Sequence, residues 1–102
     1  MQGLPQSIQL TFLNLVRPTS ISITFQGGFV GTRCVVSGAS SGNNSAEWKI
    51  LGQLYPEDVN RRQTFLLPGG ESKVDQLKLT FEESSDFFGR ITIYELDVLG
   101  EA

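Results

Sequence analysis

Thr80–Gly100 reads TFEESSDFFGRITIYELDVLG and contains the end of one strand, a polar corner and a long final strand. The corner is expected at Glu83–Gly89, where small and acidic residues interrupt the apolar pattern. The final strand is expected at Arg90–Leu99, where β-branched and aromatic residues are frequent. A long strand that follows a corner and ends the chain is what a two-layered β-structure needs to close on itself.

The apolar residues of this final strand change phase once. Ile91 and Ile93 alternate on one side, and Leu96 and Val98 alternate on the other side of an ideal strand. A shift of one residue turns every later side chain to the opposite face of a sheet. One extra residue near Tyr94-Glu95 would return the later pair to the first face, because a β-bulge does this while bending the strand. The sequence therefore predicts a bulged strand.

Six further segments alternate apolar and polar residues at the two-residue period of a half-buried strand. They are Ser7–Leu13, Thr19–Gln26, Thr32–Val36, Ala46–Leu54, Arg62–Leu67 and Lys73–Phe81. Asn14–Pro18 is expected to turn between the first two, which would then pair or lie as neighbours, since proline donates no ladder hydrogen bond. No segment shows a convincing helical period. The sequence predicts an all-β protein of about seven strands, as an antiparallel sandwich or barrel.

The length and composition limit the number of domains, the kinds of partner and the cellular compartment that we expect. The chain has 102 residues, enough for one domain, and a net charge of −3. Dispersed acidic residues argue against direct nucleic-acid binding, which normally uses a basic stripe. No window is apolar over the ~18–20 residues of a membrane span, and the first residues do not form a secretory signal. Cys34 is the only cysteine, which favours a reducing compartment and predicts an intracellular domain.

Residue chemistry supplies no catalytic set. The chain has no histidine, and Cys34 without a base is interpreted as a small buried side chain. Glu57-Asp58 and Glu82-Glu83 are pairs of adjacent carboxylates, and adjacent residues of a strand point in opposite directions. A calcium site built from Glu83 and Asp86 would match no known cation loop. We therefore predict no enzyme activity, no catalytic residue, no cofactor and no metal site.

The aromatic residues of the corner leave two interpretations open. Phe87-Phe88 occupies successive positions, so both rings cannot enter one core in extended geometry. Either Phe88 closes the end of the sandwich while Phe87 lies flat over a loop, or Phe87 joins Phe29 and Arg90 in a contact patch, because aromatic residues and arginine dominate interface energies. The candidate interaction residues of these loops are Phe29, Arg33, Asp86, Phe87 and Arg90.

Two clusters, FQGGF at Phe25–Phe29 and FEESSDFFGR at Phe81–Arg90, are neither generic turns nor generic strands. With the surrounding LKLTFEESSDFFGRITIYELDVLGE, they resemble the testicular orphan nuclear receptor-associated protein family, within the discoidin-like (coagulation factor five/eight C-type, galactose-binding-like) superfamily. The similarity runs from about Ser7 to Glu101, nearly the whole chain. It implies a jelly-roll β-sandwich with its ligand loops gathered at one end.

The resemblance also implies a function. It implies a non-enzymatic role in which the protein represses a nuclear receptor by interfering with the binding of that receptor to response-element DNA. It thereby implies a nuclear or cytoplasmic location. Family members carry an additional N-terminal segment that supplies part of the ligand-facing end and, in many superfamily members, part of a calcium loop. This sequence does not show that segment, so the resemblance does not carry either feature over.

Two functions of different classes follow from these observations. The first is a protein-interaction domain whose partner is a nuclear receptor or another transcription factor. The alternative is a carbohydrate- or lipid-binding domain of the lectin kind. Trp48 does not favour the alternative, because it alternates in phase with Ile50 and is interpreted as a core residue rather than a carbohydrate platform.

Overall fold

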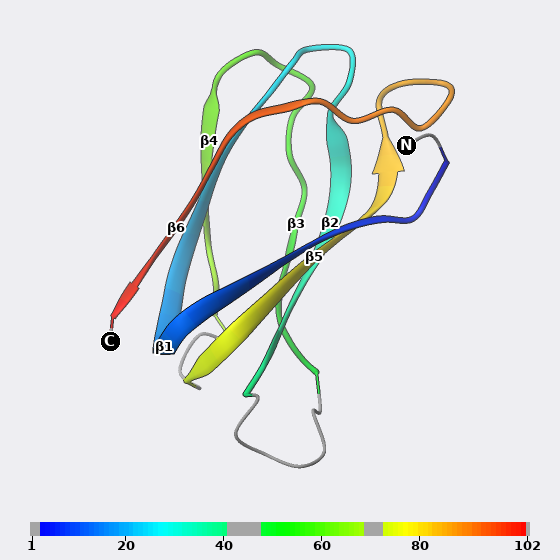
Figure 1. Cartoon of the computed structure of the whole chain (residues 1–102). Helices are drawn as coiled ribbons and strands as arrows, with labels where there is room; N and C mark the ends of the chain where they lie inside the picture. The colour runs from blue at the N-terminus through cyan, green and yellow to red at the C-terminus, as the bar shows by residue number, and fades with distance from the viewer. Residues whose placement is uncertain (1–2, 41–47, 69–72, 102) are drawn as a thin grey trace.

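The computed structural model of the chain describes residues 3–40, 48–68 and 73–101. These residues form six β-strands (Figure 1). The strands are β1 (Gln6–Phe25), β2 (Gly31–Ala39), β3 (Lys49–Leu54), β4 (Arg62–Leu66), β5 (Val74–Ser84) and β6 (Ile93–Glu101). The described ranges contain no helix long and apolar enough to cross a membrane.

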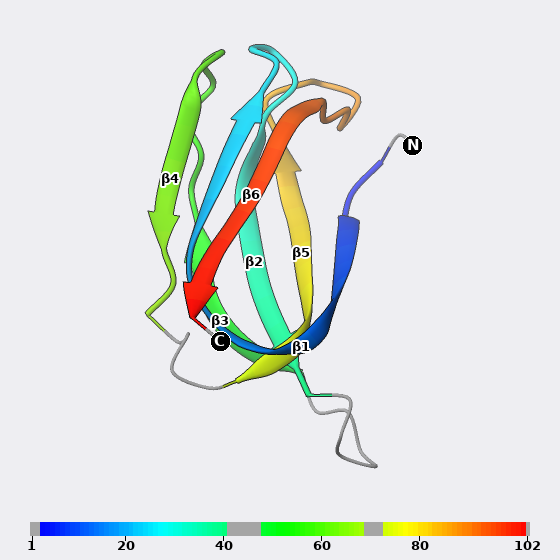
Figure 2. The same ribbon diagram turned by 60° about the vertical axis from the view of Figure 1, so that its left-hand side comes forward.

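Two antiparallel sheets share β1. The first half of β1 pairs with β5, and the order in that sheet is β3-β2-β5-β1. The second half of β1 lies between β4 and β6 in the other sheet. Figure 2 shows the bend of β1 at the lower end of the molecule, where the strand leaves one sheet and enters the other. The predicted all-β, antiparallel sandwich is confirmed.

The turn expected at Asn14–Pro18 is wrong. β1 continues through these residues and bends, with a shift in its register against β5 between Thr11 and Val16. Proline is compatible with the strand here because the ladder between β1 and β6 is itself irregular between Pro18 and Ser20. The first two predicted strands are therefore two halves of one strand, and the described residues form six strands instead of about seven.

The bulge expected near Tyr94-Glu95 is confirmed. Thr24 pairs with Glu95 and Phe25 pairs with Ile93, which leaves Tyr94 as the extra residue on β6. The apolar residues on both sides of the bulge consequently pack against the same core: Ile91, Ile93, Leu96 and Val98. The strand itself begins at Ile93 and ends at Glu101, slightly later than the predicted Arg90–Leu99.

A second bulge corrects the interpretation of Trp48. Val36 pairs with Gly52 and Ser37 pairs with Ile50, so Leu51 is the extra residue on β3. Leu51 is consequently buried, and Ile50, which was expected to point inward, is 65% exposed. Trp48 is half-buried with the Lys78 Nζ 4.4 Å from the centroid of its ring. The start of the predicted strand Ala46–Leu54 lies outside the described residues.

The core lies between the two sheets. The second half of β1 contributes the fully buried side chains of Ile21, Ile23 and Phe25. The facing side chains of β5 are Leu77, Leu79 and Phe81. Phe25 and Phe81 meet edge to face with ring centroids 5.9 Å apart, which is a favourable aromatic geometry. A Cβ on Gly31 would lie 2.3 Å from the Phe81 ring, so this glycine leaves the space that the ring occupies.

Truncating Phe81 tests this core. We expect Phe81→Ala to lower the free energy of unfolding by about 3–5 kcal/mol, because the substitution removes buried apolar area and leaves a cavity. Leu66→Ala is the matched control, since Leu66 is 80% exposed, and should change stability by at most about 0.5 kcal/mol. Urea unfolding measures both. A loss below about 1 kcal/mol for Phe81→Ala would show that this strand face does not form the core.

Candidate functional site

Three connections meet at one end of the sandwich (Figure 1). They are the β1–β2 loop (26–30), the β3–β4 loop (55–61) and the β5–β6 corner (85–92). The Gln26 amide donates to the Thr92 carbonyl at 3.0 Å, and the Thr92 amide donates to the Phe29 carbonyl at 2.9 Å. The Ser85 amide donates to the Val30 carbonyl at 2.9 Å. The corner and the β1–β2 loop are therefore joined along their backbones.

Gly27 and Gly28 connect the β1–β2 loop to the β3–β4 loop. The Gly28 amide donates to Asp58 Oδ1 at 2.7 Å, and the Gly27 amide donates to Asn60 Oδ1. Gly28 has a φ of +88°, which L side chains rarely adopt. A Cβ on Gly27 would lie 3.2 Å from Asn60 Oδ1. The two glycines are thus needed because the β1–β2 and β3–β4 loops approach closely at this point. The side chains of Asp58 and Asn60 hold the two loops together.

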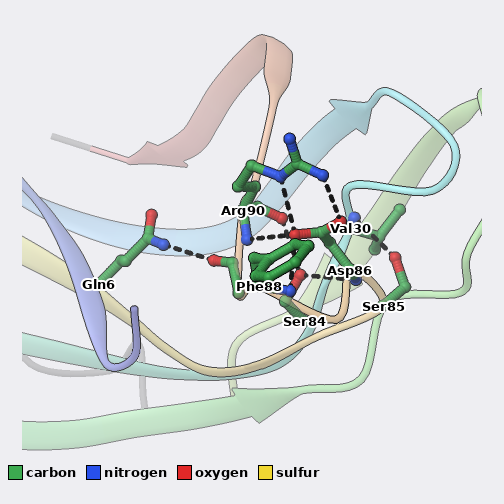
Figure 3. A network of polar contacts seen from close by, with 8 residues as sticks. Gln6, Val30, Ser84, Ser85, Asp86, Phe88 and Arg90 are labelled. Carbon is green, nitrogen blue, oxygen red and sulfur yellow. Dashed lines mark hydrogen bonds and ion pairs between the residues drawn. The ribbon is translucent and has the colours of Figure 1, made fainter. Parts of the chain in front are cut away.

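Asp86 organises the β5–β6 corner (Figure 3). Its Oδ2 accepts hydrogen bonds from the backbone amides of Phe88 and Arg90, both at 3.0 Å. The Arg90 guanidinium binds the same carboxylate through two nitrogens, Nε at 2.9 Å and Nη2 at 3.0 Å. Gly89, with a φ of +77°, allows the chain to turn back within this distance. One carboxylate therefore fixes both the backbone of the corner and the direction of the arginine.

The backbone of the corner has further support from its neighbours. Ser84 Oγ donates to the Arg90 carbonyl at 2.7 Å and accepts from the Asp86 amide at 3.0 Å. Gln6 Nε2 donates to the Gly89 carbonyl at 2.5 Å, which connects the start of β1 to the corner (Figure 3). The corner is accordingly a fixed structure, because its backbone polar groups bond to its own side chains, to Ser84 at the end of β5 and to Gln6 at the start of β1.

The hydrogen bonds also set the protonation of the pair. Hydrogen bonding from the Arg90 side chain, followed by the hydrogen bond from its backbone amide, lowers the pKa of Asp86 from 3.8 to about 2, although partial burial opposes the shift. The same hydrogen bond raises the pKa of Arg90. Asp86 and Arg90 are consequently both charged and bonded to each other at neutral pH.

Arg90 contacts two aromatic rings of the site. Its guanidinium carbon lies 5.1 Å from the centroid of the Phe29 ring and 5.5 Å from that of Phe88, within the range of a cation–π contact. Phe87 and Phe88 meet edge to face at 5.1 Å. Phe87 is 92% exposed and Phe88 is 61% exposed. We call Phe29, Phe87, Phe88 and Arg90 the corner patch.

The structure contradicts one of the two interpretations of Phe87-Phe88, and the part of Phe87 in an interaction stays a prediction. Phe88 does not close the end of the sandwich, because its ring lies on the surface beside Arg90. Of the candidate residues, Phe29, Asp86, Phe87 and Arg90 lie together. Phe88 and the loop-binding Asp58 and Asn60 were not among the candidates. The contacts of Asp58 and Asn60 cross between loops far apart in the sequence, and the glycine pair was the one signal that could have indicated them. The contacts of Phe88 are local, but they depend on the direction in which Asp86 holds Arg90.

The contacts described for Arg33 are with residues outside the corner patch. It projects from β2, with Nε 3.3 Å from Glu82 and Nη1 3.1 Å from Glu83. None of the contacts that the structure describes for Arg33 reaches the corner patch. Its proposed part in an interaction stays a prediction, and the position of its ion pairs is that of a cross-strand contact between β2 and β5.

The thiol of Cys34 is buried in the core. Burial, followed by the charge of Glu82, raises the pKa of the Cys34 thiol to about 12, so the thiol is not ionised at neutral pH. Arg61 binds Glu57 at 2.9 Å. Within the described ranges, no group of three or more cysteine, aspartate and glutamate side chains is placed to hold a metal ion.

The fold defines the class of protein, an antiparallel β-sandwich domain. The C-terminal domain of a chitobiase from Bacteroides fragilis has a similar structure, with a TM-score of 0.75 and 20% sequence identity. The likeness covers 96% of this chain and 64% of that one, and it shows the fold alone. No family model matches the chain.

Sequence relatives then define the family. The chain is 48% identical over 100 residues to the nuclear receptor 2C2-associated protein of Homo sapiens, which is 98% of this chain and 68% of that protein. The corresponding proteins of Danio rerio and Xenopus laevis are 42% and 39% identical, over 68% and 69% of their lengths. The chain belongs to the nuclear receptor 2C2-associated protein family, as its corner and glycine motifs predicted.

The pH dependence of stability tests the Asp86–Arg90 pair. The folded-state pKa of Asp86 lies below its ordinary value, so its contribution to stability is complete above about pH 5 and is lost as pH falls through about 2. Asp86→Asn keeps the shape of the side chain and removes its charge. We expect Asp86→Asn to lower the melting temperature above about pH 5 and to have little effect near pH 2. A melting-temperature difference that does not change across this range would contradict the assigned ion pair.

Proposed function

We propose that this chain is a non-enzymatic protein-interaction domain that associates with a nuclear receptor through the corner patch. The observation that carries the proposal is a fixed corner that presents two exposed phenylalanine rings and an arginine. The names of the relatives describe association with nuclear receptor 2C2, which makes that receptor the first partner to test.

The geometry of the corner patch supports a protein partner. Phe87 and Phe88 together expose a large apolar area, and aromatic residues and arginine are the residue types on which binding energy concentrates in protein interfaces. The hydrogen bonds to Asp86 hold the backbone of the patch before any partner binds. Little conformational entropy is then lost on association, because the loop is already ordered.

Charge supports contact with the receptor rather than with DNA. The chain has a net charge of −3, and Arg90, the cation of the patch, is already paired with Asp86. Phosphate contacts require free cations that replace counterions. We propose that repression works through the receptor protein, whose binding to response-element DNA the domain hinders, and that the domain acts in the nucleus, the cytoplasm or both.

The proposal of a non-enzymatic role rests on the state of the candidate nucleophile. Cys34 is fully buried in the core and its pKa is raised to about 12. A nucleophilic cysteine needs a lowered pKa and access to substrate. The most exposed residues of the corner patch are phenylalanines, which have no group that could form a covalent intermediate or transfer a proton.

The carbohydrate alternative receives less support from the same geometry. A sugar hydroxyl needs free hydrogen-bonding groups beside an aromatic ring. The carboxylate of Asp86 already accepts two backbone and two guanidinium hydrogen bonds. A sugar would have to displace these contacts, whereas an apolar side chain of a protein partner would rest on Phe87 and Phe88 without breaking them.

Binding of purified nuclear receptor 2C2 to this chain tests the proposal. We expect Phe87→Ala and Arg90→Ala each to weaken the complex, and the double variant to cost about 2 kcal/mol or more, which is about 30-fold in Kd. Biolayer interferometry measures the affinity. Leu13→Ala is the matched control, because Leu13 is an exposed apolar residue beside the start of β5, whereas the corner follows the end of β5. This variant should bind as the wild type does.

Two further results would contradict the proposal. One is an unchanged Kd for the double variant, which would remove the corner patch from the interface. The other is a set of NMR shift changes at Phe29 and Phe87 on addition of simple sugars or anionic vesicles without any binding to the receptor, which would favour the carbohydrate or lipid alternative.

A further inference from the structure

β4 is an edge strand of the sheet that also contains β6 and the second half of β1. It pairs with β1 through five consecutive residue pairs, from Thr24–Arg62 to Ser20–Leu66. Among the described residues, no strand pairs with its other side. In Figure 2, β4 forms the left margin of the molecule. This side of the strand is therefore open to another chain.

The alternation of the ladder shows which backbone groups face the open side. The Leu67 amide donates to the Thr19 carbonyl at 2.9 Å, which continues the register of β1 and β4 by one pair. In an antiparallel ladder, pairs that exchange hydrogen bonds alternate with pairs that do not. The amides and carbonyls of the odd-numbered residues of β4 thus point to β1. Those of the even-numbered residues, Arg62, Thr64 and Leu66, point to the open side.

The open side of β4 lacks the features that commonly prevent an edge strand from pairing, which are charges, prolines and bulges. The ladder between β4 and β1 has no register shift, whereas β3 has a bulge at Leu51 and β6 has one at Tyr94. β4 contains no proline. Its charged residue is Arg62, whose Nη1 lies 2.9 Å from Asp97 and 3.6 Å from Glu95 of β6. The guanidinium therefore reaches across β1, away from the open side.

Apolar side chains of β4 remain uncovered. Leu66 is 80% exposed and lies on the outer face of the sheet. Phe65, on the inner face, packs against the core but is only half-buried. Removing such apolar area from water favours association. The strand therefore offers another chain both free backbone groups and apolar side chains.

We propose that β4 pairs with β4 of a second copy of this chain, antiparallel, about a two-fold axis at Thr64. In this register Thr64 faces the partner's Thr64, and Arg62 faces the partner's Leu66. Each of these pairs exchanges both of its hydrogen bonds, because the outward groups belong to the even-numbered residues. Every outward amide and carbonyl of β4 is then bonded.

The edge is complementary to itself in register and in charge. A shift of the pairing by two residues would leave some outward groups without a partner. A shift by four would place Arg62 opposite the partner's Arg62, and like charges directly opposite each other are unfavourable. In the proposed register Arg62 keeps its ion pairs with Asp97 and Glu95. Its aliphatic stem also covers the partner's Leu66.

The length of β4 limits the strength of the contact. A strand of five residues buries less than the about 1,600 Å² of a standard protein interface. We therefore expect a dimer that dissociates on dilution, with a Kd on the order of 10–100 µM. The antiparallel pairing places the two corner patches at opposite ends of the dimer. Both corner patches stay free, so this inference goes beyond the proposed function and does not depend on it.

Amide hydrogen exchange at two protein concentrations tests the register. Well above the Kd, we expect the amides of Arg62, Thr64 and Leu66 to exchange slowly, because they bond to the partner. Well below the Kd, the same amides should exchange fast. The amides of Gln63 and Phe65 bond to β1 and should be protected at both concentrations. Neither local unfolding of β4 nor pairing at another edge would produce this alternation, which NMR resolves residue by residue.

Two substitutions at Thr64 form a matched pair. Both remove the hydroxyl that lies 2.8 Å from Ser22 Oγ. Thr64→Ala keeps the outward amide, whereas Thr64→Pro removes it and leaves the bonds of the odd-numbered residues to β1 in place. The difference between the two variants therefore measures the outward amide. By sedimentation equilibrium, we expect the dimer Kd of Thr64→Pro to be about tenfold or more above that of Thr64→Ala.

Three results would overturn the proposal. One is a wild-type chain that stays monomeric at concentrations on the order of 1 mM. Another is an equal dimer Kd for Thr64→Pro and Thr64→Ala. The third is concentration-dependent protection at β3 or β6 instead of β4. If Thr64→Pro does not fold, the alternation of amide protection in the wild-type chain decides the question. Receptor binding is tested at the corner patch and dimerisation at β4, so the failure of either proposal can be recognised separately.

Discussion

One strand that belongs to both sheets is the constraint on which the structure depends. β1 runs from Gln6 to Phe25 and pairs with β5 before its bend and with β4 and β6 after it. Its second half places Ile21, Ile23 and Phe25 against the inner face of β5. Because the same backbone holds both layers, the position of one sheet fixes the position of the other.

This arrangement also determines where the loops meet. β1 and β5 both end at the end of the sandwich opposite the bend, so the β1–β2 loop and the β5–β6 corner emerge side by side (Figure 1). Asp58 and Asn60 bind the β3–β4 loop to the β1–β2 loop. The corner patch consequently lies on loops that are held to one another by hydrogen bonds. A surface of this kind retains its shape without a partner, and recognition then depends on the side chains of Phe87, Phe88 and Arg90.

Much of the fold could be predicted from the sequence because alternating hydrophobicity is a local signal. The phase change from Ile93 to Leu96 correctly indicated the bulge at Tyr94. The continuity of β1 could not be predicted in the same way, since Asn14 and Pro18 favour a turn locally and the pairing with distant strands overrides that preference. The bulge at Leu51 was missed because Trp48 and Ile50 already gave a plausible alternation.

The candidate site, like the fold, could be predicted from the sequence only where the signal was local. The exposure of a ring at Phe87-Phe88 followed from adjacency, and the corner motif indicated Asp86 and Arg90. The role of Phe88 could not be predicted, since it depends on where Arg90 points once Asp86 holds it. Arg33 was grouped with the loops by its place in the sequence, but its cross-strand ion pairs lie on β2 and β5.

Long-range nuclear Overhauser effects between backbone protons test the shared strand most directly. The structure requires contacts from residues 7–11 to residues 76–80, and from residues 21–24 to both 62–65 and 95–98. The observation of all three sets in one molecule is the expected result. Contacts between residues 7–13 and 19–25, as in a hairpin turning at Asn14–Pro18, would contradict the shared strand and the arrangement of loops that depends on it.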